Sequence, residues 1–195
     1  RLSGVDVHVK LSDFNRAIKL DNVRVLTQAC GSLTHMAPEM LLDNQEYGSS
    51  VDTFAFGMLG FEVLEGLGAA SIYPGLLAAG LPNSLTRSEF TAKIANGSLR
   101  PTWTRFGVEL AKASGMEERT VLKHLRWVIE SCWSTDPVHR PDFLDIYRDL
   151  DDIAKTLSLL DEQNGAALHA IVPSSSTTHT VLGICDQAKV GDKTG

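Results

Sequence analysis

One carboxylate, Asp52, lies inside the most apolar stretch of the chain, and its chemistry conflicts with that setting. The stretch spans residues 49–66 and reads Ser-Ser-Val-Asp-Thr-Phe-Ala-Phe-Gly-Met-Leu-Gly-Phe-Glu-Val-Leu-Glu-Gly. A carboxylate beside a buried apolar helix needs hydrogen-bond donors, because a buried charge without a partner is costly. We therefore expect Asp52 to accept hydrogen bonds from backbone N–H groups of a neighbouring loop.

Other groups that could do chemistry do not form a recognisable constellation. The cysteines Cys30, Cys132 and Cys185 are far apart and odd in number, which indicates free thiols in a reducing compartment. The six histidines show no i, i+4 pair and no cysteine at ligand spacing, so a zinc site is not expected. A Gly-x-Ser-x-Gly hydrolase turn is also missing from the sequence.

The element that must position Asp52 is a central helix over about residues 51–65. Its apolar residues are spaced too closely for one face, which is typical of a helix surrounded by protein. Ser49 or Ser50 is expected to cap the first turn, and Gly66 is expected to end the helix in a left-handed conformation. This helix would be the core of one domain, which is the usual content of a chain of 195 residues.

The net charge and the apolar segments exclude some classes of protein. A formal charge of −6 gives no electrostatic support for binding nucleic acid. Residues 66–85 carry no charge, but Pro74, Pro82 and several glycines interrupt them, which favours a buried loop over a membrane span. The first residues lack the apolar run of a secretory leader, and the start without Met suggests a fragment. We expect a cytoplasmic protein and leave an upstream membrane anchor open.

Periodic patterns predict the remaining elements. Alternation over residues 5–11 and a second short strand over residues 22–26 indicate a β hairpin near the N-terminus. Pro38 can open a short helix, and a capping box from Thr86 to Glu89 begins a helix that buries Phe90 and Ile94 and stops at Gly97.

Two longer amphipathic helices are expected over residues 117–133 and 142–160. Trp127 and Trp133 are assigned to the core, as is the apolar stripe of the second helix that starts at Phe143. From residue 163 the composition changes to Gly, Ala, Ser and Thr, which predicts a disordered tail over residues 163–195 after a domain over residues 1–162. Modification of the tail hydroxyls in residues 174–178 is an alternative to a plain linker.

Four stretches of this chain, in this order, resemble the C-terminal half of a eukaryotic protein kinase. They are Lys10-Leu-Ser-Asp-Phe-Asn15, Gly31-Ser-Leu-Thr-His-Met-Ala-Pro-Glu39, Val51-Asp-Thr-Phe-Ala-Phe-Gly57 and Cys132-Trp-Ser-Thr-Asp-Pro-Val-His-Arg-Pro141. The resemblance covers roughly Val5 to Leu160 and is strongest to tyrosine-kinase-like Ser/Thr kinases. It implies a mainly α fold, namely the helical C-terminal lobe of the protein-kinase fold with a short β hairpin and a disordered tail.

The resemblance assigns a metal-binding role to Asp13. The family's Asp-Phe-Gly aspartate holds Mg²⁺ that bridges the phosphates of ATP, and a hard divalent cation prefers carboxylate oxygen. Phe14 is then expected to pack inward. Asn15 stands where the family has glycine, and because Asn tolerates a left-handed backbone better than other non-glycine residues, the turn is expected to survive. A plain turn aspartate after a strand is the alternative for Asp13.

Residues 13–39 would form the activation segment. Gly31, Ser32 and Leu33 would shape the floor under a protein substrate, with His35 in place of the usual tyrosine. Thr27, Ser32 and Thr34 are candidate phosphorylation sites that could order the loop.

Three further matched residues have structural roles in the family. Glu39 and Arg140 correspond to a buried ion pair that locks the end of the activation segment onto the helical lobe. Asp52 corresponds to the aspartate that caps the backbone of the catalytic loop.

The implied activity is transfer of the ATP γ-phosphoryl group to Ser or Thr of protein substrates, with Mg²⁺ as cofactor. The Gly-rich loop, the strand lysine and the catalytic-loop aspartate are missing from these residues, so no catalytic residue is assigned and the fragment alone is expected to be inactive. Two alternatives stay open: a pseudokinase or truncated lobe that acts as a protein-binding module, and an unrelated helical domain.

Overall fold

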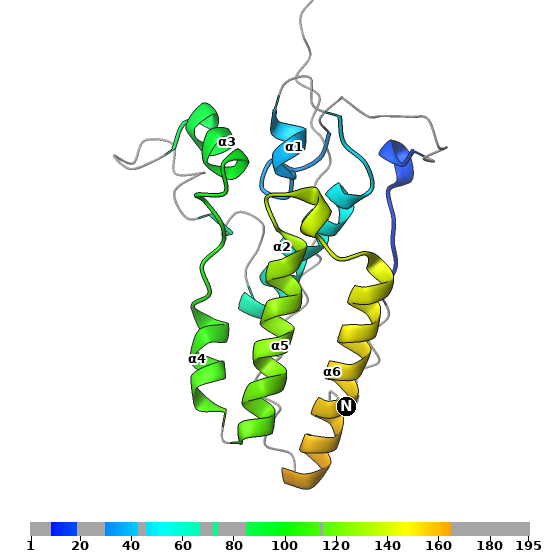
Figure 1. Cartoon of the computed structure of the whole chain (residues 1–195), viewed down its shortest axis with the longest axis vertical. Helices are drawn as coiled ribbons and strands as arrows, with labels where there is room; N and C mark the ends of the chain where they lie inside the picture. Colours follow the sequence, from blue (N-terminus) through cyan, green and yellow to red (C-terminus); the bar gives the residue numbers. More distant parts are fainter. Residues whose placement is uncertain are drawn as a thin grey trace, which may run out of the picture.

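The computed structural model describes residues 9–18, 30–42, 46–66, 72–73, 85–113 and 115–164. Those residues form a mainly helical body, which confirms the expected fold class (Figure 1). In chain order the elements are η1 (Phe14–Arg16), α1 (Pro38–Leu41), α2 (Ser50–Glu65), α3 (Arg87–Ala95), α4 (Arg105–Lys112), α5 (Met116–Cys132), η3 (Pro137–His139) and α6 (Phe143–Asn164).

Little of the predicted β hairpin falls on described residues. Val9 to Leu11 belong to them and form no strand, while residues 5–8 and 22–26 lie outside. The predicted tail lies outside as well, except for residues 163 and 164, which continue α6.

Helix α2 is the centre of the core, as its all-round apolar sequence predicts. Phe54, Met58 and Phe61 are buried almost completely, and Gly66 ends the helix at φ 66° in the left-handed region. The predicted serine cap is wrong: the backbone of Ser49 is already helical, and its side chain makes no capping hydrogen bond. Instead, the Ser49 carbonyl accepts a hydrogen bond from the Asp52 N–H group at 3.0 Å.

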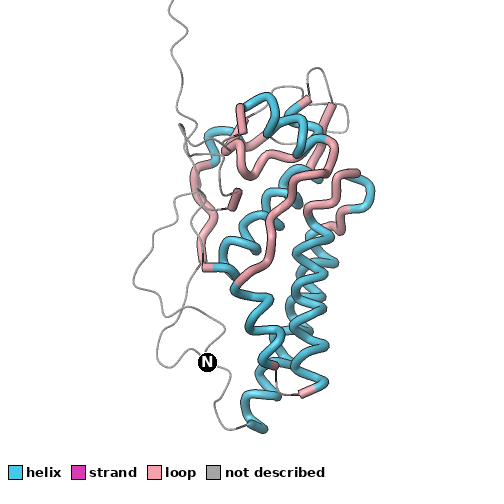
Figure 2. Tube along the Cα trace, turned by 90° about the vertical axis from the view of Figure 1, so that its left-hand side faces the viewer, coloured by secondary structure: helices cyan, strands magenta, loops and turns pink. Residues whose placement is uncertain are grey.

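Helix α5 links the other helices of the body, and most of the short elements lie at one end. Helix α5 contacts α2, α4 and α6, and α4 also contacts α2. Figure 2 shows the long helices below and most of the loops gathered at their upper end, where Figure 1 places η1, α1 and α3. The described helices include none that is long and apolar enough to span a membrane.

Two glycines let α5 approach α2 closely. A Cβ atom on Gly57 would lie 2.8 Å from the Cys132 Cβ and 3.1 Å from the Ile129 carbonyl oxygen, and one on Gly60 would lie 2.4 Å from the Ile129 Cδ1. One face of the apolar helix α2 therefore carries small residues, Gly57 and Gly60, and α5 packs against that face.

Two predicted core side chains are exposed, and one helix was not predicted. Trp127 is 59% exposed, with its ring tilted beside that of His124, and Phe143 is 48% exposed and forms an edge-to-face contact with Phe56. Both occupy the margin of an amphipathic face, which the neighbouring helix covers only in part. The helix that sequence patterns missed is α4, whose Phe106 is buried beside Trp103.

Candidate functional site

Asp13 lies exposed at the start of η1 with a backbone conformation that is unusual for an aspartate. Its φ of 60° and ψ of 63° are left-handed, and no other non-glycine residue of the described ranges has a positive φ. The left-handed residue of this turn is therefore Asp13 and not Asn15, where the family's glycine led us to expect it. The Asn15 side chain donates a hydrogen bond from Nδ2 to Asp13 Oδ1 at 2.8 Å. A short Asp and Asn pair can support a left-handed residue through such local bonds.

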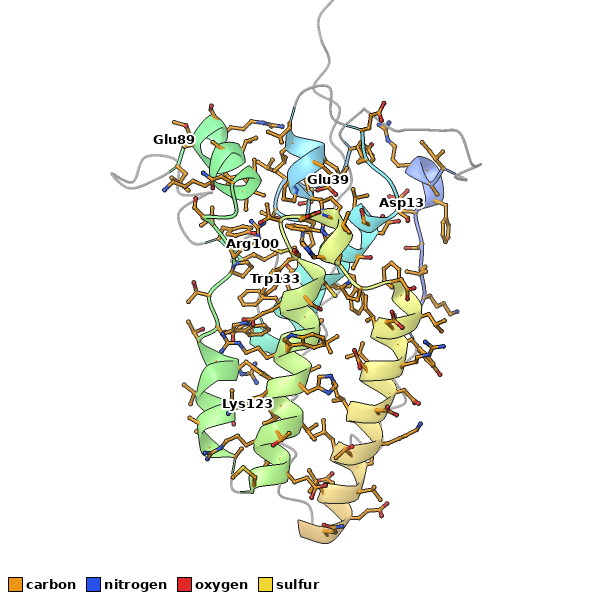
Figure 3. All side chains as sticks on the ribbon, viewed as in Figure 1. Asp13, Glu39, Glu89, Arg100, Lys123 and Trp133 are labelled. Carbon is orange, nitrogen blue, oxygen red and sulfur yellow. The ribbon has the colours of Figure 1, made fainter. Side chains whose placement is uncertain are left out.

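Phe14 does not pack inward. Its side chain is 66% exposed, and η1 contains no buried residue, because no described helix covers this turn. Figure 3 shows Asp13 at the edge of the helical body, on the opposite side from Glu89 and α3.

The donor set around Asp13 fits one part of a magnesium site. Among the described residues no group of three His, Cys, Asp or Glu side chains could hold a metal ion by itself. Mg²⁺ sites that carry nucleotides commonly use one or two carboxylates and complete the shell with phosphates and water. One exposed carboxylate, with a single oxygen held by an amide, is compatible with that arrangement.

The end of the predicted activation segment is anchored by Glu39 in α1. Arg140 Nη1 donates to Glu39 Oε1 at 2.6 Å and Arg140 Nη2 donates to Glu39 Oε2 at 2.8 Å, and both side chains are buried. Arg140 also donates to the Ser50 and Ser134 carbonyl oxygens at 3.0 and 2.9 Å. The guanidinium therefore ties α1, the start of α2 and the turn after α5 together.

The loop before α1 is held by side chains rather than by regular structure. Gly31 has φ 118°, a conformation that other L residues rarely adopt. Ser32 and Leu33 are half-buried, and Thr34 and His35 are buried. His35 Nε2 lies 3.2 Å from Glu62 Oε2 in α2, so this loop rests directly on the central helix. Thr27 lies outside the described residues.

Among the residues that the structure describes, none donates a hydrogen bond to the Asp52 side chain, in contrast to the sequence expectation. Its side chain is exposed at the start of α2, near enough to the body for partial loss of water to raise its pKa above the ordinary value. The helix N-terminus favours its negative charge but supplies no direct side-chain hydrogen bond here.

A buried carboxylate that sequence patterns did not identify is Glu65. Its oxygens accept hydrogen bonds from the Thr104 N–H and hydroxyl at 3.1 and 2.7 Å, and from the Arg105 and Phe106 N–H groups, each at 2.9 Å. Burial raises its pKa, but the hydrogen bonds from Thr104, Phe106 and Arg105 outweigh burial and lower the pKa below the ordinary value. Glu65 on α2 thus caps the start of α4. The sequence feature that could have indicated this role is a charged residue at the end of an apolar helix.

Comparisons of sequence show which known proteins this chain resembles. The family model described as "Protein kinase domain" matches residues 2–149. The chain is 31% identical over 155 residues to the serine/threonine-protein kinase VIK of Arabidopsis thaliana, covering 77% of this chain and 29% of that protein. It is 26% identical over 179 residues to the serine/threonine-protein kinase STY46 of the same plant, covering 88% of this chain and 26% of that protein. The chain therefore spans less than a third of each of these curated relatives.

Proposed function

The chain belongs to the protein kinase family, and on that premise we propose that it supplies the helical lobe and the metal-binding aspartate of an enzyme that phosphorylates Ser or Thr of protein substrates. The observation that carries this proposal is Asp13, an exposed carboxylate in a left-handed backbone conformation at the start of the segment of sequence that ends at Glu39. Strained conformations of this kind persist where the surrounding structure or the function requires them.

Asp13 would hold Mg²⁺, and the ion would neutralise charge on the phosphates of ATP. The chain's own contribution is to aim the carboxylate. The Asp13 side chain is exposed, its backbone is left-handed, and the Asn15 amide holds Oδ1 by a hydrogen bond. Asn15 therefore takes over, through its side chain, part of the positioning that a glycine at this place would leave to the backbone.

The Glu39–Arg140 ion pair would hold the substrate-binding loop in place. Both charges are buried and joined by two hydrogen bonds, so the end of the segment cannot move without breaking two charge-assisted bonds. Gly31, Ser32 and Leu33 lie a few residues before this anchor, where they would form the floor under the acceptor peptide.

Groups that orient the acceptor hydroxyl and cover ATP are not among these 195 residues. We propose that they belong to a longer protein and that the present chain alone does not transfer phosphate, because positioning and charge stabilisation would both be incomplete. The free thiols Cys30 and Cys132 fit a cytoplasmic location for that protein.

A second candidate function is a pseudokinase or truncated lobe that binds proteins without catalysis. Two departures from the family pattern favour it: Asn15 in place of glycine, and His35 in place of tyrosine. In that case the helical surface, rather than Asp13, would carry the function.

Phosphate transfer by the full-length protein distinguishes the two functions. The assay uses radiolabelled ATP, Mg²⁺ and a mixed serine- and threonine-containing peptide library, followed by phosphoamino acid analysis. The proposal expects Ser or Thr labelling that Asp13→Ala abolishes and that Asp152→Ala, an exposed carboxylate on α6, leaves unchanged. Equal labelling by Asp13→Ala would exclude the assigned role, and no labelling by the wild-type protein would favour the binding module.

A further inference from the structure

Four polar side chains form a continuous line of hydrogen bonds from the predicted substrate floor to the central helix. Ser32 Oγ lies 3.1 Å from Thr34 Oγ1, Thr34 Oγ1 lies 3.1 Å from His35 Nδ1, and His35 Nε2 lies 3.2 Å from Glu62 Oε2. We refer to Ser32, Thr34, His35 and Glu62 as the relay. The relay connects two distant parts of the sequence, because His35 and Glu62 are 27 positions apart.

The relay is buried at its inner end and accessible at its outer end. Glu62 is 2% exposed, His35 is 8% exposed and Thr34 is 9% exposed, whereas Ser32 is half-buried. Within the described ranges, Glu62 Oε1 has no hydrogen-bond partner. The Glu62 carboxylate is hydrogen-bonded there through its other oxygen, Oε2, to His35. A buried carboxylate without a hydrogen-bond donor is costly, so we expect the His35 Nε2–H group to donate a hydrogen bond to Glu62.

Hydrogen-bond capacity fixes the direction of every bond in the relay when the Glu62 carboxylate is ionised and the His35 ring is neutral. An ionised carboxylate can only accept, so His35 Nε2 must carry the proton. In the neutral ring Nδ1 is then an acceptor, and the Thr34 hydroxyl donates its single proton to it. Since Thr34 has no second proton, the hydroxyl of Ser32 must donate to Thr34, and the Ser32 oxygen can only accept from any group outside the relay.

We propose that His35 and Glu62 are positioning residues that make Ser32 an acceptor-only hydroxyl, which receives an N–H or O–H donor of the protein substrate. The inference rests on the proposed function, because it takes Gly31 to Leu33 as the floor of the substrate site. Ser32 is the member of the relay that would touch the peptide.

The relay also accounts for the histidine at position 35. Imidazole has two nitrogens on opposite sides of a rigid ring, so it can accept from Thr34 on one side while it donates to Glu62 on the other. A phenol carries a single polar oxygen and could not join both partners at these separated positions. Histidine in place of the family's tyrosine therefore supplies the two separate hydrogen-bonding atoms that contact Thr34 and Glu62.

The direction of the relay is tested first by nitrogen NMR of the folded chain with ¹⁵N-labelled histidine at neutral pH. We expect His35 Nε2 to resonate as a protonated nitrogen and Nδ1 as an unprotonated one. Glu62→Gln, whose amide can donate as well as accept, should mix the two tautomers. A wild-type ring with the proton on Nδ1, or on both nitrogens, would overturn the proposal whether or not the protein is a kinase.

The consequence for the substrate is tested by kinetics of the full-length protein with an acceptor peptide selected from a serine-containing library. Thr34→Val, which interrupts the relay, should raise KM for the peptide by about fivefold, the effect of one hydrogen bond, with kcat and KM for ATP nearly unchanged. Thr34→Ser should restore the wild-type value, and Thr120→Val, which removes a hydroxyl bond to the Met116 carbonyl on α5, should have no effect.

The outcomes separate this inference from the proposed function. If Thr34→Val does not fold, Ser32→Ala removes the hydroxyl that would touch the peptide and leaves the three inner residues in place. An unchanged peptide KM in Ser32→Ala would contradict the relay's role in substrate binding while phosphate transfer itself still supports a kinase. A wild-type protein without transfer would contradict the proposed function, and the tautomer of His35 would still be measured independently.

Discussion

Arg140 and Glu39 meet across 101 residues of sequence through two hydrogen bonds of 2.6 and 2.8 Å between buried charged groups. The Arg140 guanidinium also lies over the Phe54 ring, 5.1 Å from its centroid. The contact therefore joins the predicted substrate loop, the central helix and the turn before α6 at one point, near Glu39, which Figure 3 labels.

Breaking this ion pair should destabilise the protein strongly. Arg140→Met leaves the Glu39 carboxylate buried without its partner, which should lower the free energy of unfolding by about 3–5 kcal/mol. Urea denaturation measures the change. Arg148→Met removes an exposed arginine that pairs with Asp145, and it should change stability by less than about 0.5 kcal/mol. Similar small losses for both variants would show that the Arg140 contact is weaker than its burial implies.

Glu65 should make stability depend on pH in the acid range. Its hydrogen bonds to the start of α4 lower its folded-state pKa, so the unfolded chain takes up a proton at higher pH than the folded one. The stabilisation is complete above the ordinary glutamate pKa of about 4.3 and is lost as the pH falls through the lowered value. Urea denaturation from pH 7 to pH 3 should show that Glu65→Gln is less stable by about 2 kcal/mol at pH 7 and that the difference shrinks at low pH.

The control for this experiment is Glu117→Gln, which removes an acidic group at an exposed position of α5. A constant difference between Glu65→Gln and the wild-type protein over the whole pH range would contradict a role for the ionised carboxylate.

Gly57 should not tolerate a methyl group. An added Cβ would collide with the Cys132 Cβ and approach the Ile129 carbonyl, neither of which can rotate away. We expect Gly57→Ala to lower the unfolding free energy by about 1–3 kcal/mol, because α5 must move. Gly107→Ala, in α4 with open space around it, should stabilise by about 0.5–1 kcal/mol. Loss of stability in Gly107→Ala, or none in Gly57→Ala, would contradict the close approach of α2 and α5.

Strong periodicity made the long helices predictable. The capping box at Thr86 and Glu89 exists as predicted and begins α3, and the apolar stripes of α5 and α6 bury Leu122, Ile146 and Ile153. Periodicity does not say how much of a stripe a neighbour covers, which is why Trp127 was assigned to the core and is exposed.

Helix α4 escaped sequence patterns because its cap comes from elsewhere. Thr104 supplies no side-chain cap of the ordinary kind, and the first N–H groups bond instead to Glu65 on α2. A partner about 40 residues away in sequence leaves no local pattern.

The candidate site was predictable only through the family resemblance. Glu39 and Arg140 carry no local feature that would pair them, and the matching family positions indicated the contact that the structure contains. The contact between His35 and Glu62 was not foreseen, because His35 was noted as a departure from the family without a partner. The relay joins side chains of the loop before α1 to a side chain of α2, so it could be recognised only from the structure.

The account depends most directly on Asp13 as the residue that holds the metal. Isothermal titration of the full-length protein with ATP, in the presence and absence of Mg²⁺, tests this role without requiring phosphate transfer. We expect Asp13→Ala to weaken binding of Mg²⁺-ATP at least tenfold and to leave binding of metal-free ATP unchanged, because it removes a carboxylate ligand of the ion. Equal affinities of wild type and Asp13→Ala for Mg²⁺-ATP would contradict it.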